Sequence, residues 1–80
     1  MTQYQNFSGE SGVRFYQIEE DRIIVRFSDG ATYEYSNSSA GSGNIAEMKV
    51  LALRGRGLNS FINRYVKKRY SRKLKAGFAW

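Results

Sequence analysis

Three short runs of alternating apolar and polar residues lie between residues 13 and 36. Residues 13–18 (VRFYQI), 22–27 (RIIVRF) and 31–36 (ATYEYS) are rich in aromatic and β-branched side chains, which is typical of β-strands. Acidic residues 19–21 separate the first two runs. Asp29-Gly30 separates the last two, and this dipeptide favours a tight hairpin because glycine accepts a positive φ. The pattern predicts a three-stranded antiparallel meander.

The alternation also divides the predicted sheet into two faces, because successive side chains of a strand point to opposite sides. The face expected to pack against the rest of the domain carries Ile23, Val25, Phe27, Tyr33 and Tyr35. The face expected to point to water carries Arg22, Ile24, Arg26, Thr32 and Glu34.

The period changes to that of a helix after a loop of small residues, 36–44. Asn44 is expected to be the N-cap, because Glu47 follows three positions later as in a capping box. The helix is expected to end near Arg54, where Gly55 can adopt the left-handed conformation of a helix end. Its predicted apolar face consists of Ile45, Met48, Leu51 and Ala52, widened by Val50 and Leu53.

A second helix is predicted from about Leu58 to Lys73. Its apolar side chains recur with helical spacing and form one stripe, made of Leu58, Phe61, Ile62, Tyr65 and Val66. The order β-β-β-α-α predicts an α+β fold, with the three-stranded antiparallel meander packed against two C-terminal helices. Within it we expect a flexible lead-in over residues 1–12, one domain over 13–75 and a tail over 76–80.

The composition excludes several classes of function. The chain of 80 residues contains no Cys, His or Pro, so disulfides, Cys/His metal sites and His-based catalytic groupings are impossible. The few carboxylates fall on turns, on the outward sheet face or at a helix start, and none is expected to converge with another. We therefore expect a non-enzymatic protein with no catalytic residue, metal ligand or cofactor.

The same sequence shows no sign of a membrane or secretory segment. No apolar run approaches the roughly 18 residues of a membrane span. Residues 1–8 are polar and lack the basic and apolar regions of a signal peptide. The expected location is the cytoplasm, with no membrane partner.

Charge is distributed unevenly along the chain. Residues 1–40 carry three basic and six acidic groups, net −3, whereas residues 41–80 carry ten basic groups and one acidic group, net +9. Nine basic residues and no acidic one lie between positions 54 and 75. Such an asymmetry predicts a positive field on one side of the molecule and an acidic partner.

Cations along one helix face neutralise phosphates and release counterions, which drives nucleic-acid binding without sequence reading. Aromatic side chains among them can stack on unpaired bases. The sequence therefore predicts binding of RNA or single-stranded nucleic acid through the basic second helix and the turn before it. The residues expected to contribute are Arg54, Arg56, Arg64, Lys67, Lys68, Tyr70 and Arg72.

Two motifs resemble the KTSC domain family, small modules named for their occurrence at the C-terminus of some lysyl-tRNA synthetases. Tyr33-Glu34-Tyr35 matches the family's Tyr-x-Tyr after the hairpin turn, and residues 61–70 (FINRYVKKRY) match its C-terminal pattern. The resemblance covers residues 13–72. The family's Val-Pro before the first helix is replaced here by residues 40–45 (AGSGNI), which indicates a divergent branch.

The resemblance implies a small bacterial or phage protein, for whose family RNA binding has been suggested. It singles out Asn63, Arg64, Lys67, Arg69 and Tyr70 as signature positions. It also leaves a second function open, because a phage-type protein with this charge could be an interaction module or inhibitor that binds an acidic host protein. Homodimerisation through an exposed edge, Val13–Ile18 or Ala31–Ser36, stays open as well.

Overall fold

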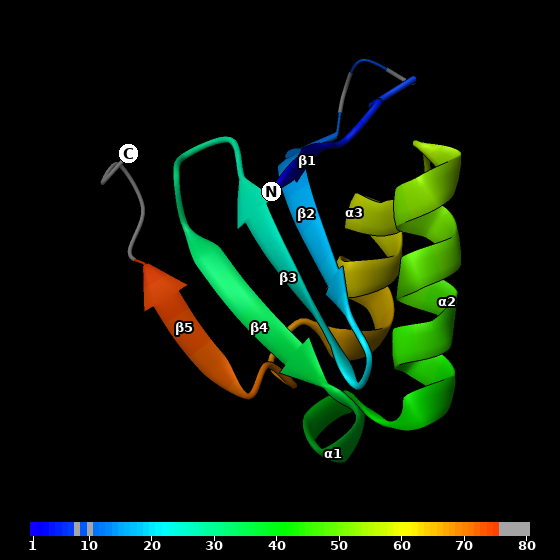
Figure 1. Cartoon of the computed structure of the whole chain (residues 1–80). Helices are drawn as coiled ribbons and strands as arrows, with labels where there is room; N and C mark the ends of the chain where they lie inside the picture. Colours follow the sequence, from blue (N-terminus) through cyan, green and yellow to red (C-terminus); the bar gives the residue numbers. More distant parts are fainter. Residues whose placement is uncertain (8, 10, 76–80) are drawn as a thin grey trace.

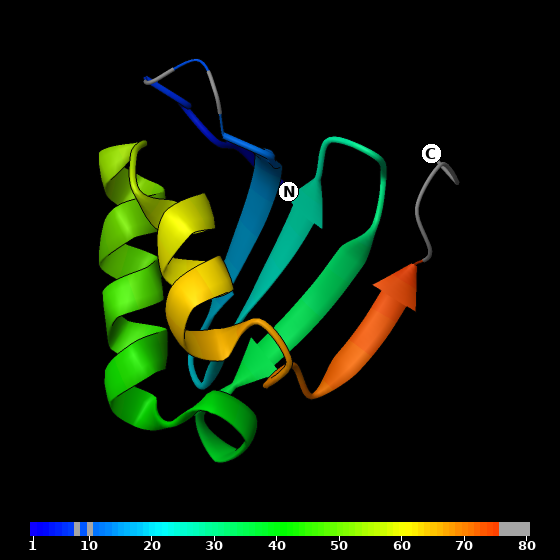
Figure 2. The ribbon, with the colours of Figure 1, turned by 180° about the vertical axis from the view of Figure 1, so that it is seen from behind.

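The computed structural model describes residues 1–7, 9 and 11–75, and it shows an antiparallel sheet with helices on one face (Figures 1 and 2). The α+β class is therefore confirmed, but the sheet has five strands where three were predicted. The strands follow one another in space as in sequence. They are β1 (Thr2–Gln3), β2 (Val13–Glu19), β3 (Arg22–Phe27), β4 (Thr32–Ser36) and β5 (Arg72–Lys75).

The central strands β2, β3 and β4 are those predicted from the alternation. Val25 in β3 pairs with Tyr16 on one side and with Tyr33 on the other, so all three side chains share the face that meets the helices. Gly30 adopts φ 91° in the turn before β4 and donates its N–H to the Phe27 carbonyl at 2.9 Å. The positive φ accounts for the glycine at this hairpin.

Part of the predicted lead-in is folded onto the domain. Thr2 and Gln3 form β1 and pair with Tyr16 and Phe15 of β2. The next residue, Tyr4, is 2% exposed, and its hydroxyl accepts the Leu58 N–H at 3.2 Å. Burial of the Tyr4 ring removes apolar surface from water, and this stabilises the packed position of the N-terminal segment.

Gly55 allows the N-terminal segment to approach the helices closely. It ends the first long helix with φ 82°, as predicted, and donates its N–H to Leu51 at 3.0 Å. Its carbonyl accepts the Phe7 N–H at 2.9 Å. A Cβ at this position would lie 2.6 Å from the Cβ of Gln5, so the contact requires glycine.

The helices begin earlier than predicted. Residues 37–40, predicted as loop, form α1 (Asn37–Ala40), because Ser36 and Ser39 build a capping box at its start. The next helix, α2 (Ser42–Arg54), has Gly41 as its N-cap. The predicted N-cap, Asn44, instead lies within α2 and donates its side-chain amide to the Ala40 carbonyl at 2.8 Å.

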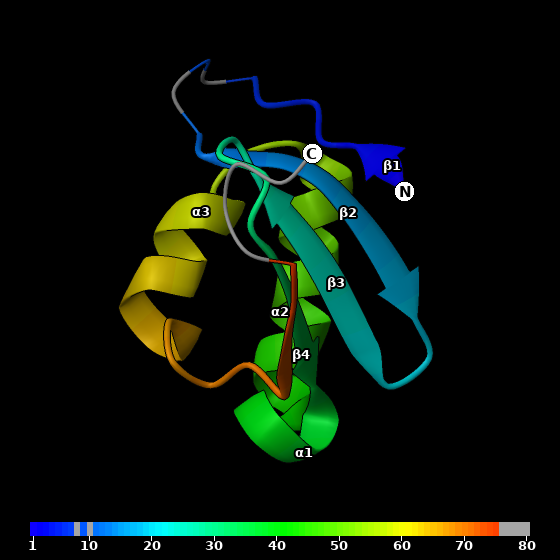
Figure 3. The ribbon, with the colours of Figure 1, turned by 90° about the vertical axis from the view of Figure 1, so that its left-hand side faces the viewer.

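The second predicted helix is shorter than expected. It consists of α3 (Leu58–Phe61), which continues into the π-helical turn η1 (Ile62–Val66). Residues 67–71 then turn back, and the chain runs as β5 along β4 (Figure 3). The prediction of helix to position 73 was wrong: residues 72–75 pair with β4, and Glu34 of β4 holds Ser71 and Arg72 through side-chain hydrogen bonds that a continued helix would not make.

The core lies between the sheet and the helices, and every predicted member of the α2 face except Val50 and Leu53 is buried. Those two are 47% and 68% exposed because they lie on the side of α2 away from the sheet. Tyr65 of the second stripe is also exposed. In the described part of the chain, no helix has the length and apolarity needed to cross a membrane. The largest fully buried side chains are Tyr35, Ile23, Ile45, Met48, Leu58, Val13, Val25 and Val66.

Candidate functional site

A pocket of about 490 Å³ opens between the helix face of β3–β4 and the end of η1. This volume lies within the roughly 300–1,000 Å³ of small-molecule sites. It lies between β4 with its hairpin on one side and η1 with the turn after Val66 on the other. It is lined by Gly12, Phe27, Ser28, Asp29, Ala31, Tyr33, Tyr35, Ile62, Asn63, Lys67, Lys68 and Tyr70.

Aromatic rings form the floor of the pocket, with Tyr33 at their centre. The ring centroid of Tyr33 lies 4.8 Å from that of Tyr70, 5.9 Å from that of Phe27 and 6.4 Å from that of Tyr35. These separations are those of attractive offset and edge-to-face pairs. Phe27 and Tyr33 were predicted to be core, yet both are only half-buried because the pocket exposes them.

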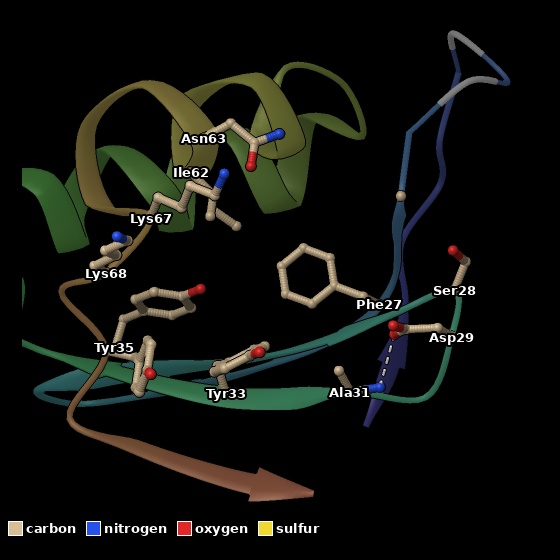
Figure 4. Close-up of a pocket in the computed structure, with 12 residues that line it drawn as sticks. Phe27, Ser28, Asp29, Ala31, Tyr33, Tyr35, Ile62, Asn63, Lys67 and Lys68 are labelled. Carbon is tan, nitrogen blue, oxygen red and sulfur yellow. Dashed lines mark hydrogen bonds between the residues drawn. The ribbon is translucent and has the colours of Figure 1, made fainter. Parts of the chain in front are cut away.

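The charged groups of the pocket lie at opposite ends. Figure 4 shows Lys67 and Lys68 at one end and Ser28 and Asp29 at the other, with the aromatic floor between them. Both lysines and Asp29 are exposed, so their charges are hydrated in the free protein. A ligand with a negative group at one end and hydrogen-bond donors at the other would match this arrangement.

Tyr35 lines the pocket and is 1% exposed as a residue, and its hydroxyl makes no hydrogen bond within the described residues. Because no fully buried side-chain oxygen or nitrogen in that part of the chain lacks a partner, the hydroxyl itself keeps contact with the open pocket. Burial raises the pKa of Tyr35, and the neighbouring Tyr33 and Tyr70 raise it further. The phenol therefore stays protonated near neutral pH and can donate to a ligand.

β5 is fastened beside the pocket by Glu34, which was predicted to face water but is 5% exposed. Its carboxylate accepts from Arg72 at 3.1 Å, from Ser71 Oγ at 2.7 Å and from Arg22 at 3.2 Å. These hydrogen bonds, that of Arg72 above all, lower the pKa of Glu34 to about 2. Thr32, also predicted to face water, is buried between Arg26 and the Gly30 carbonyl.

We name Glu34, Arg22, Ser71 and Arg72 the Glu34 clamp. Lys73, the residue of β5 after Arg72, places its ammonium 5.5 Å from the centroid of the Tyr33 ring, which lines the pocket. The Ser71 N–H also donates to the Glu34 carbonyl at 2.7 Å. The clamp thus holds the chain that carries the pocket wall at residues 67–70.

The Glu34→Gln variant is expected to lower the free energy of unfolding by about 2 kcal/mol, because hydrogen bonds to a charged group become neutral ones. The wild-type carboxylate has a lowered pKa, so its stabilisation is complete above about pH 4.5 and is lost as the pH falls towards 2. Urea unfolding of both proteins from pH 7 to pH 2 checks this. The two stabilities should converge in acid.

Asp21→Asn is the matched control for this prediction. Asp21 also pairs with Arg22, at 2.9 Å, but its side chain is 58% exposed. An exposed pair contributes little, so the control should unfold like the wild type at pH 7. Equal losses in the two variants would contradict a special role for the clamp.

The structure brings together four of the nine predicted binding residues, Asn63, Lys67, Lys68 and Tyr70, as lining of the pocket. It does not bring the other five there. Arg54 and Arg56 lie at the turn before α3, more than about 10 Å along the helix from Lys67.

The remaining three have other surroundings. Arg64 lies 5.8 Å from the exposed Tyr65 ring, and Arg69 is an exposed residue of the turn after η1. Arg72 belongs to the Glu34 clamp, which gives a residue predicted to bind phosphate a structural contact instead.

Sequence reasoning missed the sheet side of the pocket, namely Phe27, Asp29, Tyr33 and Tyr35. The alternation assigned three of them to the packed face. The available signal was the chemistry of that face: two tyrosines bring hydroxyls that a sealed core does not require. Asp29 was assigned to the hairpin turn, where its Oδ1 indeed accepts the Ala31 N–H at 3.0 Å.

The edges predicted for homodimerisation are at least partly occupied. β4 lies inside the sheet, because β5 pairs along it at Thr32, Tyr33 and Glu34. β2 is paired with β1 at Phe15 and Tyr16. β5 could not be anticipated as an edge because its residues were assigned to a helix.

Comparison of the chain with protein-family models, curated proteins and solved structures finds no match. Among the described residues, no group of three or more Asp or Glu side chains is arranged to hold a metal ion. The inference of function therefore depends on the pocket and its chemistry.

Proposed function

We propose that this protein binds single-stranded nucleic acid, RNA or DNA, by taking one unstacked nucleotide into the pocket. The observation that supports the proposal is the juxtaposition of an aromatic floor around Tyr33 with two exposed lysines, Lys67 and Lys68, at one end. A nucleotide has the complementary parts, a flat base and a phosphate. The pocket volume of about 490 Å³ is that of a small-molecule site.

Stacking would supply the contact to the base. A base on an aromatic side chain contributes about 1–3 kcal/mol and does so for any base, since all four have a π-face. Tyr33 and Tyr70 offer ring area in the pocket, and Tyr70 is 40% exposed in the free protein. A duplex keeps its bases stacked inside, so this mode favours single strands.

The chain around the pocket would supply the electrostatic attraction. Six basic residues lie between positions 67 and 75, and only Arg72 has an acidic partner there, Glu34, among the described ion pairs. Lys67, Lys68 and Lys73 border the pocket or its floor. They can follow one sugar-phosphate backbone past the pocket.

The resemblance to the KTSC family enters this proposal as a further expectation. Three of the five signature positions, Asn63, Lys67 and Tyr70, line the pocket. We propose that the family pattern describes this nucleotide site, with residues 40–45, at the junction of α1 and α2, as the divergent part.

The salt dependence of binding tests the proposed function. Three phosphate contacts to a single strand should give a plot of log affinity against log salt with a slope of about −2. Fluorescence anisotropy with a labelled uridine 12-mer between about 50 and 200 mM salt measures it. An absence of binding at the low-salt end would contradict the proposal. Nuclease-resistant capture of one acidic protein would then favour the alternative of a protein-interaction module.

A further inference from the structure

The pocket has an acidic end as well as a basic one, and we propose that this polarity makes the site selective for guanine. The inference rests on the proposed function and names the base that the site prefers. It assigns the phosphate to Lys67 and Lys68, the ring of the base to the aromatic floor, and the donor edge of guanine to Asp29.

Asp29 is well placed to act as an acceptor. Its Oδ1 accepts the Ala31 N–H at 3.0 Å, which fixes the carboxylate in the turn, and Gly30 at φ 91° completes that turn. Figure 4 shows this hydrogen bond at the end of the pocket opposite Lys67 and Lys68. The second oxygen makes no hydrogen bond within the described residues. A carboxylate has about four lone-pair positions, so both oxygens can still accept from a ligand.

Guanine is the base whose edge fits such a group. Its N1–H and N2 amine are adjacent donors, which a carboxylate can accept together through its two oxygens. Cytosine and adenine present an amine beside an acceptor nitrogen, and uracil presents one N–H between two carbonyl oxygens. In each of these three, one carboxylate oxygen would face a lone pair, which is repulsive.

The other polar groups agree with this orientation. The O6 and N7 acceptors of guanine need donors, and the pocket offers the protonated hydroxyl of Tyr35 and the amide of Asn63 between its two ends. The aromatic floor reaches from Phe27 near Asp29 to Tyr70 on the segment that carries the lysines. One nucleotide can therefore contact both ends of the pocket.

Uridine heptamers that differ in one central nucleotide test the selectivity. The central position carries guanosine, inosine, adenosine or uridine, and anisotropy gives each dissociation constant at about 50 mM salt. We expect guanosine to bind about tenfold more tightly than uridine. Inosine keeps N1–H and O6 but lacks the N2 amine, so its affinity should lie between those two.

Asp29→Asn removes the carboxylate that would accept from guanine but keeps the turn that positions it. An asparagine oxygen can still accept the Ala31 N–H, and Asn-Gly is equally suited to this hairpin. In this variant the preference for guanosine over uridine, taken as the ratio of the two dissociation constants, should fall to about twofold or less. Asp21→Asn makes the same change of charge outside the pocket and should keep the full preference.

The outcomes distinguish this inference from the proposed function. Equal binding of all four heptamers by the wild type would overturn the guanine selectivity, and an undiminished preference in Asp29→Asn would overturn its assignment to Asp29. Either result would leave single-strand binding in place. A failure to bind any heptamer would overturn both.

Discussion

The double variant in which Glu replaces both Lys67 and Lys68 is expected to bind a uridine 12-mer about a hundredfold more weakly at about 50 mM salt. Two cations at one end of the pocket are lost, and two anions are placed where the phosphate should lie. Both lysines are exposed and lie after the helix ends at Val66, so the fold should be retained. Anisotropy measures the affinity, and thermal unfolding checks the fold.

Arg54→Glu combined with Arg56→Glu is the matched control. It makes the same change of net charge at the turn before α3, at the other end of the α3–η1 helix. Charges further apart than the Debye length of about 10 Å at 0.1 M salt are largely screened. Both double variants are therefore also compared at about 0.1 M salt, where the control should lose less than about fivefold in affinity. Equal losses of affinity in the two double variants would show that the electrostatic attraction of the strand comes from the net charge of the protein and not from the lysines at the pocket.

Tyr70→Leu is expected to weaken the same complex about tenfold or more, with little effect of salt on the loss. The variant keeps an apolar side chain but removes the ring that lies 4.8 Å from Tyr33 and contributes to the pocket floor. Tyr70→Phe keeps the ring and should retain most of the affinity. Because Tyr70 is 40% exposed, neither change should lower the stability by more than about 1 kcal/mol.

Tyr65→Leu is the control for the loss of an exposed tyrosine. Tyr65 is 54% exposed and packs on Phe61 at 4.8 Å, but it does not line the pocket. Its replacement should leave affinity unchanged. If Tyr65→Leu and Tyr70→Leu lost affinity equally, stacking would not be confined to the pocket.

The parts of the fold that follow from local pattern were predictable. The alternation around Ile23 and Val25 and the hairpin glycine at position 30 were sufficient for three strands. The spacing of Ile45, Met48 and Leu51 was sufficient for the buried face of α2. In each case the preference of the local sequence agrees with the tertiary structure.

The fifth strand was not predictable from local pattern. Residues 67–75 are mostly Lys and Arg, which are good helix formers, and nothing within the segment opposes a helix. The stabilising partner is Glu34, 38 positions before Arg72. A polar contact between residues so far apart in sequence cannot be predicted from the local spacing of apolar residues. The end of the apolar stripe at Val66 was the one local sign that the helix stops.

Of the twelve residues that line the pocket, four were predicted from the sequence as binding residues: Asn63, Lys67, Lys68 and Tyr70. The segment 67–70 is recognisable in the sequence because it combines charged and aromatic residues, namely Lys67, Lys68 and Tyr70. Tyr33 and Phe27 are not recognisable in this way, because alternation assigns a face of the sheet but does not determine how far the helices cover it. Their exposure depends on how the helices pack over β3 and β4, which is a property of the assembled fold.

The central claim is that a single strand binds at the pocket between β3–β4 and the end of η1. Amide and side-chain NMR shifts during titration with a uridine heptamer test it most directly, since they report the contact by residue. The account predicts that the shifts concentrate on Tyr33, Tyr35, Asn63, Lys67, Lys68 and Tyr70. Shifts centred on Arg54 and Arg56, or spread over the sheet face opposite the helices, would contradict it.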